Sequence, residues 1–124
     1  MVEGRAHVLI VDDSALVTDA LRLLFEESGY DVSVAGSVRE AVDAGVARAV
    51  DVMLLDLTLP DGDGLVALTD LRERGVEPRV TAALTGHEAA EVTVRCVAAG
   101  CQAVLVKPVP IADLLKQVRE WTAR

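Results

Sequence analysis

Residues 8–14 read Val-Leu-Ile-Val-Asp-Asp-Ser and give the clearest indication of the fold. A continuous aliphatic run of this kind favours a strand that is covered on both faces. The run ends in two aspartates and a serine, after which apolar residues recur at helical spacing from Val17 to Ser28. Gly29 ends that helix in the way typical of a C-terminal glycine. The stretch therefore predicts a βα unit.

The same unit recurs along the chain. Further strands are predicted at 31–35, 52–55, 80–84 and 103–106, and further helices at 37–48, 65–74, 87–99 and 110–122. Alternating strands and helices build a parallel sheet with right-handed crossovers. We therefore expect one α/β domain over residues 1–124, doubly wound, with five parallel strands and helices on both faces. The segment 60–64 is predicted to be a loop on composition.

The charge balance excludes several classes of partner. The chain has 12 Lys and Arg against 20 Asp and Glu, a formal charge of −8. This disfavours direct binding to nucleic acid or to an anionic membrane. No apolar run approaches a membrane span and no signal region opens the chain, so we expect a cytoplasmic protein. Cys96 and Cys101 lack metal-ligand spacing and are expected to be plain thiols.

Polar side chains follow the predicted strands where each strand ends. They are Asp12, Asp13, Asp56, Thr85 and Lys107. Because ligands of doubly wound sheets bind at the carboxyl ends of the strands, we expect these groups to meet. Clustered carboxylates repel one another unless a cation lies among them, and carboxylate oxygens are preferred ligands of Mg²⁺. A lysine and a hydroxyl nearby suit phosphoryl oxygens. The set predicts a metal-dependent phosphoryl site.

The four motifs that carry these residues resemble those of the bacterial response-regulator receiver domain over essentially the whole chain. They are Leu-Ile-Val-Asp-Asp-Ser at 9–14, Leu-Leu-Asp-Leu-Thr-Leu-Pro-Asp-Gly-Asp-Gly at 54–64, Leu-Thr-Gly at 84–86, and Lys-Pro at 107–108. The resemblance implies a flavodoxin-like receiver fold with strand order 2-1-3-4-5. It also implies a single-domain receiver that acts by binding a partner protein or by passing phosphate on.

The resemblance further implies a chemistry for these positions. Asp56 would accept a phosphoryl group from a phosphohistidine on a sensor histidine kinase or phosphotransfer protein. Mg²⁺ (or Mn²⁺) would be bound by Asp12, Asp13, Asp56 and the backbone carbonyl of Thr58.

Phosphate binding and switching would fall to Thr85, Gly86 and Lys107. The Lys107–Pro108 peptide bond is expected to be cis. A downstream protein of unknown identity would read the switch.

Lesser roles are expected for five further side chains. Thr58 and His87 would tune the lifetime of the phosphoryl group. Val104 stands where the family usually carries an aromatic switch residue, so the usual coupling to the output face is expected to be weak. On the first helix, Leu16 and Leu23 lie one heptad apart on a polar flank, and we expect them to dock the phosphodonor.

Two other functions compete with the phosphoacceptor hypothesis. A receiver fold can serve as an interaction or dimerisation module that does not depend on phosphorylation. An aspartate-nucleophile phosphatase would carry a second aspartate two residues after the nucleophile, where this chain has Thr58. We therefore expect no enzyme beyond a domain that catalyses its own phosphorylation and dephosphorylation.

Overall fold

The computed structural model describes residues 5–86 and 89–123. The helices are α1 (Ala15–Glu27), α2 (Val38–Ala47), α3 (Leu65–Glu73), α4 (Ala90–Ala99) and α5 (Ile111–Thr122). The strands are β1 (His7–Val11), β2 (Asp31–Ala35), β3 (Val52–Asp56), β4 (Thr58–Leu59), β5 (Gly62–Asp63), β6 (Val80–Thr85) and β7 (Ala103–Val106). Within these residues no helix is long and apolar enough to cross a membrane.

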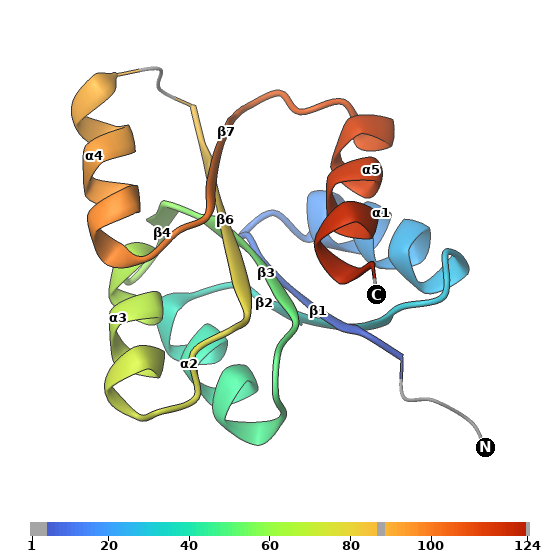
Figure 1. The fold of residues 1–124 in the computed structure, drawn as a ribbon, viewed down its shortest axis with the longest axis horizontal. Helices are drawn as coiled ribbons and strands as arrows, with labels where there is room; N and C mark the ends of the chain where they lie inside the picture. Colours follow the sequence, from blue (N-terminus) through green and yellow to red (C-terminus); the bar gives the residue numbers. More distant parts are fainter. Residues whose placement is uncertain (1–4, 87–88, 124) are drawn as a thin grey trace.

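The central sheet has five parallel strands in the order β2-β1-β3-β6-β7. This confirms the expected order 2-1-3-4-5, with β6 and β7 as the fourth and fifth strands. Helices α2, α3 and α4 cover one face of the sheet, and α1 and α5 cover the other (Figure 1). The order reverses between β1 and β3, which places the ligand-binding edge of a doubly wound sheet beside these two strands.

Two apolar clusters, one on each face, hold the sheet between the helices. Every residue of β1 and β3 is buried, and their side chains alternate between the faces. Leu9 packs with Leu68 on the α2–α4 side. Ile10 packs with Phe25 on the α1–α5 side. The buried strands therefore fix where the residues that follow them emerge.

The structure corrects three local expectations. Segment 60–64 is not wholly loop, because β4 and β5 form a small antiparallel hairpin around Pro60 and Asp61. The helix expected from residue 87 begins at Ala90, since Ala89 has extended backbone. Pro110 precedes α5 instead of occupying its first turn.

The buried face of α1 differs from the one that the spacing of its apolar residues predicts, which is centred near Val17, Leu21 and Leu24. Thr18, Leu21 and Phe25 face the core, whereas Val17 is 40% exposed. The apolar pattern leaves out Thr18 because its side chain is polar, yet Thr18 is buried and Val17 lies on the flank that faces α5.

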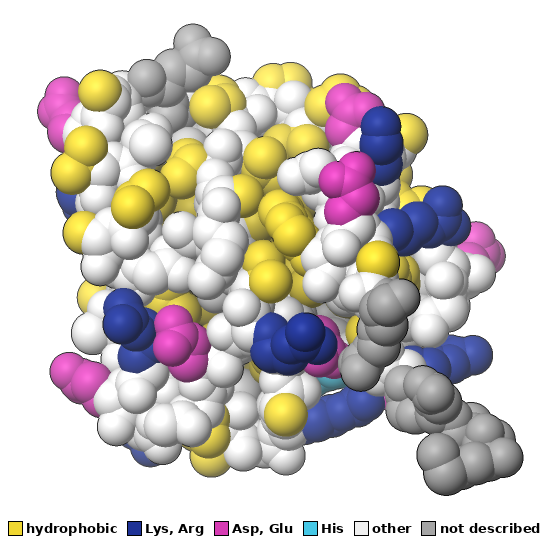
Figure 2. All heavy atoms as spheres, in the orientation of Figure 1, with side chains coloured by type: hydrophobic (Ala, Val, Ile, Leu, Met, Phe, Trp, Pro, Cys, Tyr) yellow, Lys and Arg dark blue, Asp and Glu magenta, His cyan; other side chains and the backbone are white. Residues whose placement is uncertain are grey.

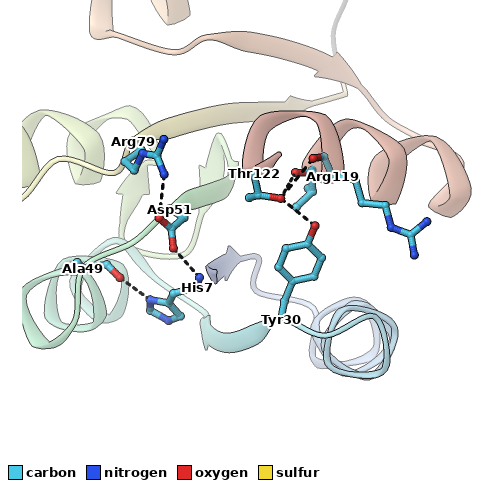
Figure 3. Close-up of polar contacts among 8 residues, drawn as sticks. His7, Tyr30, Ala49, Asp51, Arg79, Arg119 and Thr122 are labelled. Carbon is cyan, nitrogen blue, oxygen red and sulfur yellow. Dashed lines mark hydrogen bonds and ion pairs between the residues drawn. The ribbon is translucent and has the colours of Figure 1, made fainter. Parts of the chain in front are cut away.

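Polar contacts connect several elements at the end of the sheet where its strands begin (Figure 3). This end lies opposite the strand ends that carry Asp12, Asp13 and Asp56. The buried His7 ring donates through Nδ1 to the carbonyl of Ala49 at 2.8 Å, and its backbone N–H donates to Asp51 at 2.7 Å. At the same edge the hydroxyl groups of Tyr30 and Thr122 lie 2.9 Å apart and tie α5 to the start of β2. These contacts brace the domain opposite the candidate site.

Candidate functional site

Three carboxylates converge at the carboxyl ends of β1 and β3. One oxygen each of Asp12, Asp13 and Asp56 lies within 4.8 Å of the others. Asp12 and Asp56 are 4% and 7% exposed, while Asp13 is exposed. The convergence follows from the parallel pairing of β1 with β3, which ends both strands at one edge of the sheet.

Local hydrogen bonds orient the two buried carboxylates. Oδ1 of Asp12 accepts from the backbone N–H of Ser14 at 2.9 Å, and Oδ1 of Asp56 accepts from that of Thr58 at 3.0 Å. Each aspartate thus folds over the turn that follows its own strand, a conformation that aspartate side chains favour. Both second oxygens are left facing the site.

Lys107 supplies the positive charge of the site from the end of β7. Its Nζ lies 3.1 Å from Oδ2 of Asp12 and 3.2 Å from Oδ2 of Asp56. Burial by itself would lower the pKa of the ammonium, but the hydrogen bonds to the two aspartates outweigh it and the pKa is raised above its ordinary value. The Lys107–Pro108 peptide bond is cis.

The donor set fits a hard divalent cation. Three carboxylates and one ammonium leave the site with net negative charge, and all the clustered ligand atoms are oxygens. Oxygen-only donors and a partly open site suit Mg²⁺, which keeps several waters. Asp12, Asp13 and Asp56 would hold the ion, and the backbone carbonyl of Thr58, two residues after Asp56, is the expected further ligand.

The β4–β5 hairpin forms the wall beside Asp56. At its tip both oxygens of Asp61 accept backbone N–H groups at the start of α2, from Val38 at 2.8 Å and Arg39 at 3.1 Å. These bonds lower the pKa of the Asp61 carboxyl. At its base Gly64 passes so close to Asp56 that a Cβ there would overlap the aspartate's backbone oxygen. The hairpin is therefore packed tightly against Asp56.

The remaining predicted residues lie around this centre. Thr85 is buried at the end of β6, the strand beside β3, and Gly86 after it is exposed. Val104 is partly buried against the α2–α4 cluster. Leu16 and Leu23 are 83% and 59% exposed. His87 lies outside the described residues.

Three residues near the site have no role that the local sequence predicts. Asp61 and Asp63 belong to segment 60–64, which composition predicts to be a loop, and their positions depend on the β4–β5 hairpin. Arg95 of α4 pairs with Asp63, and nothing in the local sequence marks it.

An apolar groove runs from the site between α1 and α5, with a volume of about 600 Å³. Asp12 and Lys107 lie at its polar end. Its walls are aliphatic and include Leu16, Val17 and Ile111.

The fold and its acidic pocket define a receiver-type α/β domain, and comparison with known proteins agrees. The profile described as the response regulator receiver domain matches residues 8–119. The transcriptional regulatory protein PdtaR of Mycobacterium tuberculosis is 33% identical over 119 residues, which are 95% of this chain and 57% of that protein. The chain thus spans about half the length of curated relatives such as this one. It belongs to the response regulator receiver domain family.

Two solved structures extend the comparison. Chemotaxis protein CheY4 of Vibrio cholerae superposes with a TM-score of 0.88 at 27% identity, covering 94% of this chain and 98% of that one. A response regulator protein from Burkholderia pseudomallei, described with a phosphorylated aspartic acid, a calcium ion and citrate, superposes with a TM-score of 0.80 at 25% identity, covering 95% and 73%.

Proposed function

We propose that this domain is the phosphoacceptor of a two-component or phosphorelay system and that Asp56 carries the phosphoryl group. The observation that carries the proposal is the placement of Asp56, whose carboxylate is oriented by Thr58 and contacted by Lys107 within the acidic cluster. The phosphorylated aspartate of the Burkholderia pseudomallei relative supports the same chemistry.

The transfer step exchanges one bond for another. A carboxylate oxygen of Asp56 attacks the phosphorus of a phosphohistidine, the P–N bond breaks as the O–P bond forms, and an acyl phosphate results. Asp12, Asp13 and Asp56 would hold a Mg²⁺ ion, which when bound would neutralise charge on the phosphoryl oxygens. Lys107, kept protonated by its raised pKa, contacts a phosphoryl oxygen. Thr85 and Gly86 border the group, and the Thr85 hydroxyl is the expected switch contact.

Two residues are proposed to set how long the acyl phosphate lasts. Thr58 and His87 follow Asp56 and Thr85 by two positions each and flank the path of an attacking water in this family. Neither side chain is a strong carboxylate base, so unusually fast hydrolysis is not expected.

The output side of the domain is proposed to be coupled only weakly through Val104, because a valine lacks the alternative ring positions of an aromatic switch. Hydrophobic side chains gather between α4 and α5 on the face shown in Figure 2. The large exposed aliphatic residues of α4, β7 and α5 are Val94 and Val97 on α4, Val106 on β7 and Ile111 on α5. Such a face fits a downstream protein partner.

Docking of the phosphodonor is proposed along α1 and the groove beside it. Leu16 and Leu23 lie on the side of α1 opposite Thr18, Leu21 and Phe25, and Leu16 also lines the groove. A helix of a sensor kinase or phosphotransfer protein that packs here brings its histidine to the polar end of the groove.

The test is intact-mass measurement after incubation with acetyl phosphate and Mg²⁺. The wild-type protein gains one phosphoryl group, while Asp56→Asn and chelator-treated wild-type protein gain none. An unlabelled wild type would contradict the proposal and favour the alternative, a receiver fold used as a phosphorylation-independent interaction module.

A further inference from the structure

An ion pair joins the hairpin beside Asp56 to α4. Arg95 of α4 contacts Oδ2 of Asp63 on β5. Asp63 is the direct cross-strand partner of Thr58. The N–H of Thr58 in turn donates to Asp56. Contacts therefore run without a gap from the acceptor carboxylate, through the two strands of the hairpin, to the middle of α4.

Asp63 is held on both of its oxygens. Oδ2 contacts Arg95, and Oδ1 accepts a hydrogen bond at 2.9 Å from the backbone N–H of Leu65, the first residue of α3. The next residue, Gly64, donates its N–H to the carbonyl of Leu57 at 2.9 Å. The guanidinium of Arg95 thus pairs with a segment of β5 that already packs against Asp56. The ion pair links this segment to α4.

Arg95 also borders the acceptor site itself. A hollow of about 370 Å³ lies between the hairpin and α4, and Thr58, Thr85, Asp63 and Arg95 all line it. The paired side chains of Arg95 and Asp63 are 54% and 37% exposed. An ion pair of this exposure is a modest interaction, so its loss should change the site's properties by a small factor and leave the fold intact.

We propose that Arg95 is a positioning residue for the metal site. Arg95 holds Asp63 on β5 and thereby fixes the neighbouring strand β4, which carries the backbone carbonyl of Thr58. The inference rests on the proposed function, in which that carbonyl is a ligand of Mg²⁺. Without the ion pair, binding of Mg²⁺ must also order the hairpin, and its affinity falls accordingly.

Arg95→Gln removes a positive charge and Asp63→Asn removes a negative one. Comparing the two variants therefore distinguishes a positioning role from a direct electrostatic effect on the metal ion. Isothermal titration gives the Mg²⁺ Kd of wild type, Arg95→Gln, Asp63→Asn and the double variant; the asparagine keeps an oxygen for the Leu65 N–H. If Arg95 acts by positioning, the Kd for Mg²⁺ rises about two- to fivefold in both single variants. The Kd of the double variant is then no higher than that of the single variant that binds Mg²⁺ more weakly. Direct electrostatics gives opposite signs, since loss of a cation strengthens Mg²⁺ binding and loss of a carboxylate weakens it. That result would overturn the proposal.

A second readout needs no metal. Amide hydrogen exchange at Thr58 and Asp63 should be faster in both single variants of the metal-free protein, and Arg95→Lys should restore part of the protection. The matched control is Arg74→Gln, which breaks an exposed ion pair with Asp70 on α3 and should change neither quantity. If wild type binds no Mg²⁺, the proposed function fails; if wild type binds it and the variants match wild type, only this inference fails.

Discussion

The ammonium of Lys107 lies 3.2 Å from Oδ2 of Asp56, although the two residues are 51 positions apart in the sequence. The pairing depends on β6, which lies between β3 and β7 and aligns their carboxyl ends. Asp12 shares the same ammonium at 3.1 Å. In the absence of a metal ion, Lys107 therefore neutralises part of the charge of the two buried carboxylates, and this role can be tested.

Replacing Lys107 by methionine should destabilise the metal-free protein by about 1–3 kcal/mol, between the values typical of exposed and of buried ion pairs. Saturating Mg²⁺ should remove most of that loss, because the ion compensates the same carboxylates. Urea unfolding with and without Mg²⁺ measures both quantities. Lys116→Met, on the exposed side of α5, is the control and should show neither effect. An equal loss with and without Mg²⁺ would show that Lys107 acts elsewhere.

The raised pKa of Lys107 predicts a pH range for this stabilisation. Because the folded pKa lies above the ordinary value of 10.5, the contribution is complete below that pH and is lost as pH rises through the folded pKa. The difference in unfolding free energy between wild type and Lys107→Met should therefore stay constant from neutral pH to about 10 and shrink only above it. A difference that already declines between about pH 7 and 9 would contradict the assignment.

The double substitution Leu16→Ser and Leu23→Ser should slow phosphotransfer from a cognate histidine-phosphorylated protein by about tenfold or more, since full burial of a leucine side chain contributes about 1.5–3 kcal/mol. Labelling by acetyl phosphate should be unchanged. Val94→Ser with Val97→Ser removes an equally exposed aliphatic pair from α4 and should leave the transfer rate intact. Loss of labelling with both donors would mean that the α1 leucines support the fold.

The residue pattern was sufficient to predict five parallel strands and the meeting of Asp12, Asp13 and Asp56, because buried strands have a strong signature and polar residues follow them directly. The order of the strands was predicted from the family resemblance alone. The residue pattern did not reveal the β4–β5 hairpin, since two-residue strands leave no periodicity. Nor did it single out Arg95, whose contact with Asp63 depends on how α4 is placed across a distance of 32 residues. The exposure of Leu16 and Leu23 on α1 was predicted, but the predicted buried face of this helix wrongly included Val17, which is apolar and yet 40% exposed.

Asp56 alone is proposed to accept the phosphoryl group, and mapping of the modified residue distinguishes it from the other aspartates. The protein is labelled with acetyl phosphate and Mg²⁺, the acyl phosphate is reduced with borohydride to homoserine, and peptides are sequenced by mass spectrometry. Homoserine is expected at position 56 and at no other aspartate. Conversion at Asp12 or Asp13, or full labelling of Asp56→Asn, would contradict the assignment to Asp56.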